Sequence, residues 1–523
     1  MGGATMAEHI VETTTGKVKG YERNGLLEYL GIPFAEPPVG ALRFKRAVPK
    51  TPWEGIFDAK EYGAEAVQMG ENNKPTGSED CLTINIQRPV EGDMLPVFVW
   101  IHGGGYNGGS ASVPLYNGAS FARDGIVFVS FQYRLNVLGF YDFVTYPGCE
   151  DFDSNCGVSD QIVALQWMHK NIKAFGGDPE RVTIAGESAG GASVVNMLAA
   201  PAVKGCFQQA IAQSGLPNCV VSHQMARDNI DIFMERLGWT EKDLPKLRTI
   251  DPYELLEANE YVGKKHQYKN PGMYLPGPVQ DDLIPVRPID AIRGGSAAGV
   301  KLIIGETAHE GTTFVHPKDT GFPNSWAMIA AMFEKSGNIE HFPDIIRYYH
   351  PDADAYLKEF NEQSSKFGAE STTLPDVPVS KVGVPFIHFA TDYVFQVPAV
   401  KVAEGQRHYT DDVWMFRYDL ITKSGEESGL KASHAFDLPA TFANRDFHFS
   451  QFVFDGEPDE VFERIADEMH GAWVRFTKTG DPGWPKYEGY VSPVRIFDRE
   501  TRTEKLDRTE LMQVWGDMRF YEA

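Results

Sequence analysis

The chain has 523 residues, of which 42% are hydrophobic, enough for a large buried core. At about 150 residues per domain this length suggests roughly three domains, although large α/β enzymes often build a single domain around one wide sheet. The 72 acidic residues outnumber the 49 basic ones and give a formal net charge of −23. Phosphate backbones and anionic lipid surfaces would repel such a chain, so we exclude nucleic acid and anionic membranes as general partners.

The N-terminal residues 1–8 carry neither a basic patch nor an apolar run, so they do not resemble a secretory signal. No apolar stretch reaches the about 18 residues that a membrane-spanning helix needs. We therefore expect a cytoplasmic protein without a membrane span, and both a monomer and a homodimer fit the sequence. A secreted protein whose leader has been removed is the alternative.

Short apolar runs, rich in β-branched and aromatic residues and bounded by turn residues, predict buried strands. They lie at 96–101, 126–131, 182–185, 210–212 and 302–304. Helical patterns are found at 160–175, 189–200 and 459–477. This alternation predicts an α/β fold with a large, mostly parallel central sheet flanked by helices. We expect one domain over residues 1–523, in which the more polar, helical stretches 222–274 and 321–384 are cap- or lid-like insertions.

The chain has five cysteines, an odd number that does not suggest a disulfide framework. Cys149 and Cys156 are close enough in sequence to form a bridge, but reduced thiols are the favoured interpretation. No Cys-x-x-Cys spacing occurs, so we expect no metal site of that kind.

The strongest functional motif is Gly186-Glu187-Ser188-Ala189-Gly190, which lies between an apolar strand and an apolar helix. A sharp strand-to-helix turn strains the backbone at Ser188, and the glycines two residues to either side remove the clashes. The turn would raise the Ser188 hydroxyl above the sheet, near a helix N-terminus that favours developing negative charge. An ordinary serine in a glycine-rich turn is the alternative, and the flanking strand and helix argue against it. We therefore predict that Ser188 is a nucleophile.

A serine hydroxyl is a weak nucleophile and needs a base, an orienting acid and donors for an oxyanion. The segment His102-Gly103-Gly104-Gly105 follows a predicted strand, and its glycines let backbone N–H groups approach a substrate oxygen. We assign the oxyanion hole to Gly104, Gly105 and Ala189. A flexible glycine-rich hairpin is the alternative, and a phosphate-binding loop is disfavoured because no Gly-Lys-Ser/Thr follows. We expect His102 to brace this loop, because the order Ser, acid, His requires a base further along the chain.

Several further strings span nearly the whole chain, at 31–38, 42–44, 78–82, 133–136, 160–161, 175–179 and 476–482. Together with the serine motif they resemble the type-B carboxylesterases, the α/β-hydrolase family that includes cholinesterases and some lipases. The resemblance implies an α/β-hydrolase fold. It also implies hydrolysis of small carboxylic esters through an acyl-enzyme intermediate, without a cofactor or metal.

In this family the triad acid is a glutamate in a Glu-Gly pair just after a strand. That pattern fits Glu310, which follows the predicted strand 302–304, and Glu306 is the alternative. The family's base fits His434, within the string 432–439. The resemblance thus implies a triad in the chain order expected for this fold, Ser188, Glu310 and His434.

The resemblance also implies a buried polar network beside the triad, formed by Glu187, Ser214 and Asp437. It implies two structural ion pairs as well, Arg43 with Glu79 and Arg134 with Asp160.

The sequence differs from many members of this family at several positions, and these differences argue against a cholinesterase. Cys81 matches a cysteine that pairs with an upstream one in many relatives, but no cysteine precedes it here, which favours a reducing compartment. The segment 67–81 lacks the long loop that carries the choline platform of cholinesterases and argues against that activity. Val221 stands where cholinesterases have an acyl-pocket tryptophan, so we expect a roomier acyl side. Further pocket-lining candidates, for which core packing is an equal alternative, are Tyr106, Phe314 and Phe395.

Our interpretation is therefore a serine carboxylesterase. The first alternative is a lipase, or a hydrolase of lactone, amide or carbamate bonds in a specialised metabolite or xenobiotic. A long apolar lid would favour a lipase, but the segment 67–81 is short and polar. A non-catalytic adhesion protein on the same scaffold is a remote alternative, disfavoured because all three triad residues are present.

Overall fold

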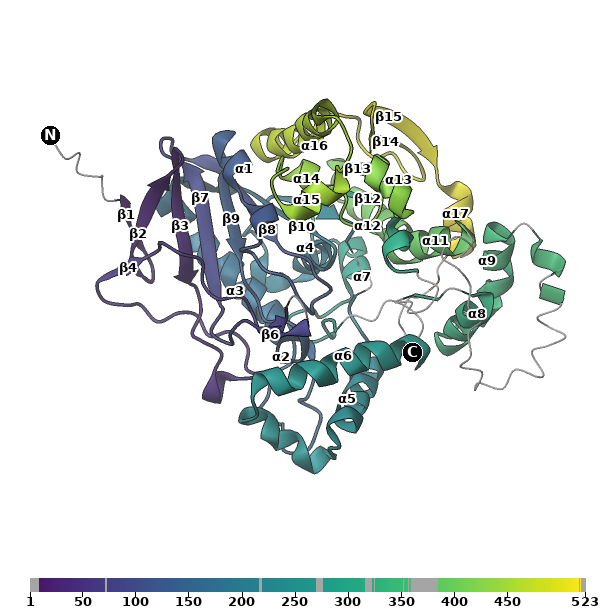
Figure 1. Ribbon diagram of the computed structural model, residues 1–523, viewed down its shortest axis with the longest axis horizontal. Helices are drawn as coiled ribbons and strands as arrows, with labels where there is room; N and C mark the ends of the chain where they lie inside the picture. Colours follow the sequence, from purple (N-terminus) through teal and green to yellow (C-terminus); the bar gives the residue numbers. More distant parts are fainter. Residues whose placement is uncertain are drawn as a thin grey trace.

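The computed structural model describes residues 9–70, 73–215, 219–269, 276–315, 322–323, 325–350, 352–355, 357–358, 384–516 and 518. Across these residues the chain forms a 13-stranded sheet with helices around it (Figure 1). A separate hairpin pairs two short strands, β5 (Gln68–Met69) and β6 (Pro75–Thr76).

The N-terminal part of the large sheet is mostly antiparallel. In spatial order its strands are β1 (His9–Thr13), β2 (Gly16–Arg23), β3 (Leu26–Pro33) and β7 (Thr83–Pro89), with β4 (Ile56–Asp58) beside β2. The sheet continues through β9 (Val127–Phe131), β8 (Leu95–Ile101), β10 (Gly177–Glu187), β11 (Gln209–Gln213), β12 (Lys301–Thr307), β13 (Val413–Tyr418), β14 (Val491–Phe497) and β15 (Arg502–Asp507). All neighbours from β9 to β14 are parallel. The predicted large, mostly parallel sheet is therefore confirmed.

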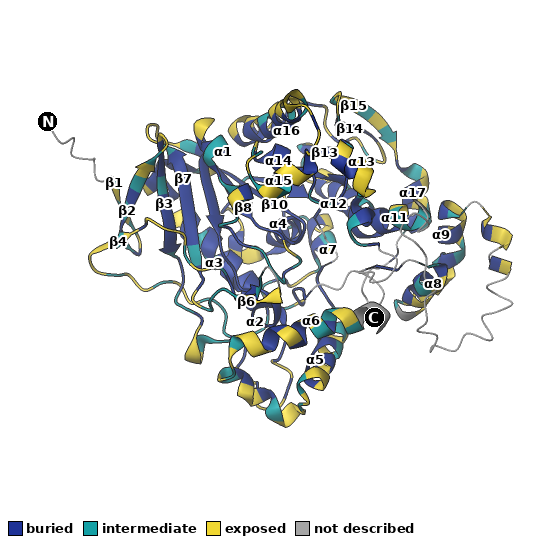
Figure 2. Ribbon diagram, in the orientation of Figure 1, coloured by how far each residue is buried: buried dark blue, intermediate teal, exposed yellow. Residues whose placement is uncertain are grey.

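The parallel strands are buried on both faces, which explains their continuous apolar runs (Figure 2). One row of paired residues packs with α1 (Ala119–Arg123) and α16 (Asp459–Thr479), and it consists of Ala185, Ile211, Ile303 and Trp414. The row one residue earlier packs with α3 (Cys156–Asn171), α4 (Ala189–Ala199) and α12 (Val397–Arg407), and it consists of Ile184, Ala210, Leu302 and Val413.

The three predicted helices are present with shifted ends. The helices α4 and α16 begin at the predicted residues, 189 and 459. Helix α3 begins at Cys156, earlier than the predicted start at 160, directly after Asn155 takes a left-handed φ of 55°. Its predicted last turn is a separate 3-10 helix, η4 (Ile172–Phe175). None of the helices in the described ranges combines the length and the apolar character needed to cross a bilayer.

Two pairs of helices lie outside the layers that cover the sheet (Figure 1). In the predicted insertion 222–274, α5 (His223–Leu237) packs against α6 (Pro252–Lys269). In the predicted insertion 321–384, α8 (Trp326–Lys335) packs against α9 (Phe342–Tyr349). Parts of both predictions lie outside the described residues, namely 270–274, 321, 324, 351, 356 and 359–383.

Both expected ion pairs are present. Arg134 Nη2 lies 2.7 Å from Asp160 Oδ1 in the interior, and the Arg43 guanidinium pairs with Glu79. Arg43 also donates to two carbonyls at the end of η6 (Glu241–Arg248) and just beyond it, those of Leu247 and Ile250, at 3.0 and 2.6 Å. This one side chain therefore ties the insertion between α5 and α6 to the body of the protein.

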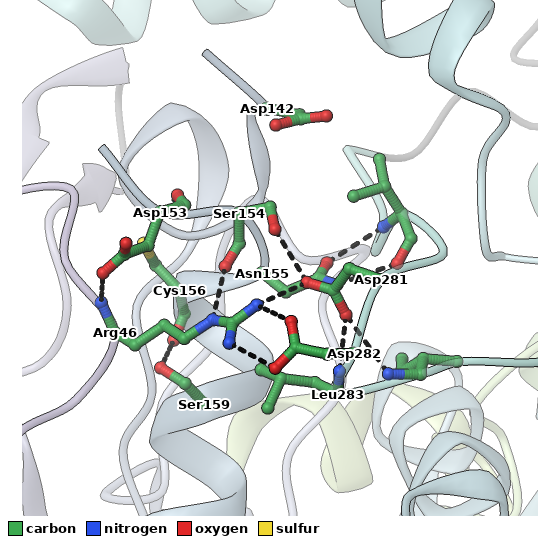
Figure 3. A network of polar contacts seen from close by, with 12 residues as sticks. Arg46, Asp142, Asp153, Ser154, Asn155, Cys156, Ser159, Asp281, Asp282 and Leu283 are labelled. Carbon is green, nitrogen blue, oxygen red and sulfur yellow. Dashed lines mark hydrogen bonds and ion pairs between the residues drawn. The ribbon is translucent and has the colours of Figure 1, made fainter. Parts of the chain in front are cut away.

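A second set of polar contacts, centred on Arg46, holds the segment 276–284 in place (Figure 3). Its guanidinium donates to Asp281 at 2.8 Å and to both carboxylate oxygens of Asp282 at 2.8 and 2.7 Å. Nearby, the Asn155 amide exchanges two hydrogen bonds with the backbone of Val279, at 2.8 and 2.9 Å. These contacts fix the segment 276–284 against Arg46 and against the loop that precedes α3. The five cysteines are all free thiols and buried, so Cys149 and Cys156 are not bridged.

Candidate active site

Ser188 lies at the turn from β10 into α4. Its backbone has φ 58° and ψ −123°, a conformation that a non-glycine residue rarely adopts. A Cβ at Gly186 would lie 2.4 Å from the Gly190 carbonyl carbon, and a Cβ at Gly190 would lie 2.1 Å from the Ile101 oxygen. Both glycines are therefore required by close backbone packing, and the turn leaves Ser188 8% exposed.

The glycine loop that follows β8 packs directly on this turn. A Cβ at Gly103 would lie 3.2 Å from the Ser188 Cβ. Gly104 and Gly105 have φ values of 110° and 61°, in the left-handed region that favours glycine. Within the described part of the chain, the N–H groups of Gly104, Gly105 and Ala189 donate to no backbone or side-chain acceptor. Three unused donors thus lie around the Ser188 turn.

His434 lies beside the predicted acid. Its Nδ1 is 2.5 Å from Glu310 Oε2, and Glu310 is completely buried. The other Glu310 oxygen accepts from Ser214 Oγ at 2.6 Å and from the Thr307 N–H at 2.7 Å. Every oxygen of this carboxylate therefore has a donor, and its orientation toward the imidazole is held from the ends of β11 and β12.

Glu306, the alternative acid, is directed elsewhere. It is buried on β12, where its Oε1 lies 3.6 Å from Arg508 Nη2. Burial raises the pKa of Glu306 to about 7. Of the two glutamates, the structure brings only Glu310 to His434.

Glu187 lies on the other side of the imidazole, with its Oε1 3.2 Å from His434 Nε2. Among the described residues no hydrogen bond joins Ser188 Oγ to His434. Hydrogen bonds between catalytic groups are often long without substrate and tighten in the substrate complex. The structure therefore places the His434 imidazole between two carboxylates, one of which, Glu187, directly precedes Ser188.

Three carboxylates and one imidazole share this buried volume. Burial raises the pKa of Glu187 to about 8 and that of Asp437 to about 6. Burial alone would lower the pKa of His434, but the charges of Glu187 and Glu310 outweigh it and raise the pKa to about 9. The cluster therefore binds a proton more strongly than an isolated histidine does. The negative charges around His434 stabilise the protonated, positively charged form of its ring.

Gln213 is a site residue that the sequence analysis missed. Its Nε2 donates to Asp437 Oδ2 at 2.8 Å and to Thr441 Oγ1 at 3.0 Å, and its Oε1 accepts from Trp473 Nε1 at 2.8 Å. Its carbonyl also accepts the Ser188 N–H at 3.0 Å. The available signal was its position at the end of the predicted strand 210–212, directly before Ser214.

The pocket candidates separate into two groups. The rings of Phe314 and Phe395 each lie 5.1 Å from the His434 ring. Tyr106 is instead fully buried, with its hydroxyl 3.1 Å from Ser193 Oγ. Val221 is also buried and pairs with the segment 276–284, its N–H donating to the Pro278 carbonyl at 2.8 Å.

His102 lies under the glycine loop rather than beside Ser188. Its ring stacks on Tyr133 with 4.4 Å between centroids, and its Nδ1 lies 2.9 Å from the Gly103 carbonyl. Burial lowers the pKa of His102 to about 4, which keeps the ring neutral.

Comparison with known proteins shows which family the chain belongs to. The sequence profile of the carboxylesterase family matches residues 7–515. The chain is 34% identical to the para-nitrobenzyl esterase of Bacillus subtilis (strain 168), covering 97% of this chain and 98% of that protein. It is 31% identical to the phenmedipham hydrolase of Pseudarthrobacter oxydans, covering 94% and 95%.

A solved structure of a PNB esterase superposes with a TM-score of 0.81 at 33% identity, covering 97% of this chain and 99% of that one. The predicted α/β-hydrolase fold and the predicted resemblance are both confirmed. This chain belongs to the carboxylesterase family and is a carboxylic ester hydrolase.

Proposed function

We propose that the enzyme hydrolyses its ester through a triad of Ser188, His434 and Glu310. The observation that carries this assignment is the 2.5 Å contact between His434 Nδ1 and the buried Glu310 carboxylate. A histidine held in this way presents its Nε2 as the proton acceptor, and the carboxylate stabilises the imidazolium that then forms. The strained turn at Ser188, at the end of β10, supplies the nucleophile.

In the proposed cycle, His434 Nε2 comes within hydrogen-bond reach of Ser188 Oγ when the substrate binds, while Glu187 stays close to the ring. It takes the hydroxyl proton as Oγ attacks the acyl carbonyl, and then gives that proton to the departing alcohol. The acyl group is left on Ser188. A water molecule, deprotonated by the same imidazole, attacks the acyl-enzyme, and collapse of the second tetrahedral intermediate releases the acid and restores the serine.

The tetrahedral oxyanion would be held by the N–H groups of Gly104, Gly105 and Ala189. Their lack of other acceptors within the described residues supports this role, because a donor already engaged would first have to break that bond. Each such donor contributes about 3 kcal/mol to transition-state stabilisation in serine hydrolases. The N-terminus of α4 adds a positive potential at the same place.

The proposed substrate is a small, uncharged ester. Phe314 and Phe395 flank the imidazole that protonates the leaving alcohol, so this side of the site favours an apolar or aromatic alcohol. The buried carboxylates next to His434 would repel an ester whose alcohol part already carries a negative charge. Both features are compatible with the para-nitrobenzyl substrate named for the bacterial relative.

The test is the Ser188→Ala variant, assayed with a short p-nitrophenyl ester. We expect hydrolysis to fall to background, and we expect an organophosphate to label wild-type Ser188, as mapped by peptide mass spectrometry. Ser450→Ala is the matched control, because Ser450 is fully buried on α15 (His448–Val453) away from these groups. Retained activity in Ser188→Ala, or an adduct on another residue, would overturn the assignment.

A further inference from the structure

Hydrogen bonds within the glycine loop fix the direction of one of its backbone donors, the Gly105 N–H. The carbonyl of Gly104 accepts the N–H groups of Asn107 at 3.0 Å and of Gly108 at 3.1 Å. In a planar trans peptide the C=O and the following N–H point in opposite directions. Fixing the Gly104 carbonyl toward Asn107 therefore fixes the direction of the Gly105 N–H on the opposite side of the same peptide.

Two residues of the body hold this loop in place, Gln68 through its side-chain amide and Asn136 through its backbone N–H. Gln68 on β5 pairs with Gly109, accepting its N–H at 2.8 Å and donating to its carbonyl at 3.0 Å. Asn136, at the start of α2 (Asn136–Phe140), donates its backbone N–H to the Tyr106 carbonyl at 2.6 Å. These bonds engage residues 106 and 109 and leave the Asn107 side chain to be held from elsewhere.

A third residue that contacts the loop, Asn259, lies on helix α6 in the predicted insertion 222–274, which we call the cap. Asn259 on α6 donates from Nδ2 to Asn107 Oδ1 at 2.9 Å, although 152 positions separate the two residues. Asn259 is 6% exposed, so the donor end of this partly buried bond is shielded from water. Helix α6 packs on α2 through an apolar cluster that includes Leu256 and Leu138 (Figure 1). The bond therefore joins two well-packed elements.

We propose that Asn259 is a positioning residue for the oxyanion hole, through which the cap helix α6 orients Asn107 and with it the Gly105 N–H. This inference rests on the proposed function, in which that N–H binds the oxyanion. The bond from Asn259 holds Asn107 so that its backbone N–H stays on the Gly104 carbonyl. Without it, the Asn107 side chain is free to rotate and the 104–105 peptide loses part of its preorganisation.

The expected signature is a split between kcat and KM. A donor that is misaligned weakens binding of the oxyanion far more than binding of the neutral ester. In Asn259→Ala we expect kcat to fall about fivefold to tenfold, the size of one lost hydrogen bond, with KM nearly unchanged. Affinity for a trifluoromethyl ketone, which forms a tetrahedral adduct on the serine, should fall by the same factor.

Two matched controls separate this effect from loosening of the cap. Tyr253→Phe removes another bond between α6 and the body, from the tyrosine hydroxyl to the Gly77 carbonyl at 2.8 Å. Asn229→Ala removes an equally buried asparagine from α5, whose Oδ1 has no hydrogen-bond partner among the described residues. Both should keep wild-type kcat and inhibitor affinity, whatever their effect on the melting temperature.

The experiment is a double-mutant cycle over Asn107→Ala, Asn259→Ala and the combined variant, measured with a p-nitrophenyl ester and the trifluoromethyl ketone. We expect the combined variant to be no slower than either single variant, because both remove the same bond. Additive losses, wild-type kcat in Asn259→Ala, or equal losses in Tyr253→Phe would overturn the proposal. If Asn259→Ala does not fold, Asn107→Ala removes the bond from the loop side and the same kcat and inhibitor criteria apply. Activity retained in Ser188→Ala would instead refute the proposed function itself.

Discussion

Replacing Glu187 with glutamine tests the charge that faces the base. Glu187→Gln keeps the shape of the side chain and removes a negative charge 3.2 Å from His434 Nε2. At an effective dielectric constant of about 20, two unit charges at this separation attract by about 5 kcal/mol. Burial raises the pKa of Glu187 to about 8, so most of the population is protonated at neutral pH and the attraction is expressed mainly at the higher pH where His434, with a pKa of about 9, titrates. We expect the pKa of the His434 cluster to fall by about one to two units, which is about 1.4 to 2.7 kcal/mol.

The sign of the effect on rate depends on pH. His434 must be neutral to accept the Ser188 proton, so kcat/KM rises with pH through the pKa of the cluster. The variant should reach its plateau at lower pH, but the plateau should be about tenfold to a hundredfold lower, because the imidazolium of the transition state lacks Glu187. Below both pKa values the free enzyme already carries the imidazolium. At such low pH, Glu187→Gln loses the attraction to the imidazolium equally in the free enzyme and in the transition state. The kcat/KM values of the variant and the wild type should therefore converge.

The measurement is the pH profile of kcat/KM for wild type, Glu187→Gln and Glu306→Gln with a neutral ester. Glu306→Gln is the matched control, because Glu306 is equally buried but faces Arg508 instead of the imidazole. Its profile should coincide with that of the wild type. An unchanged or higher apparent pKa in Glu187→Gln would refute the electrostatic reasoning, as would a uniform loss of rate at every pH.

Three other outcomes follow from the same geometry. Glu310→Gln should lower kcat by about 10⁴-fold by removing the charge that orients and stabilises His434, with an unchanged circular dichroism spectrum; a loss below tenfold would contradict its role. Arg134→Met should lower the free energy of unfolding in urea by about 3 to 5 kcal/mol, because the buried Asp160 carboxylate is left without its partner; a stability equal to wild type would contradict this. All five thiols are free and buried, so a thiol reagent should titrate five groups after denaturation and few or none before; fast reaction of the native protein would contradict that burial.

The sequence was sufficient to single out Ser188 as the proposed nucleophile, because everything that makes this residue unusual is local. The strand, the two glycines and the following helix all lie within β10 and α4. The sequence was less decisive about the proposed acid, because Glu306 and Glu310 both follow the same apolar run. What separates them is long-range: Glu310 meets His434, 124 positions away, whereas Glu306 lies on β12 opposite Arg508. No pattern near either glutamate records those partners.

Side-chain direction was the other quantity that the sequence left open. Tyr106 directly follows the glycine loop, which made it a candidate for the pocket. In the structure its backbone takes φ 55°, and its hydroxyl contacts Ser193 and Asn196 in the interior. The pairing of Asn259 with Asn107 is of the same kind, since two neutral amides far apart in the chain leave no periodic or charge signal.

The spacing of the site along the chain also has a consequence for biosynthesis. The bonds that hold the site together join Ser214 to Glu310, Glu310 to His434 and Gln213 to Asp437, across 96, 124 and 224 positions. Contacts of such high sequence separation form late, and chains of this size fold through partly assembled intermediates. A nascent chain on the ribosome thus contains Ser188 well before the residues proposed to activate it have been synthesised. With the proposed triad, esterase activity should therefore appear only after His434, at position 434 of 523, has left the ribosome, so that it reports a late stage of folding.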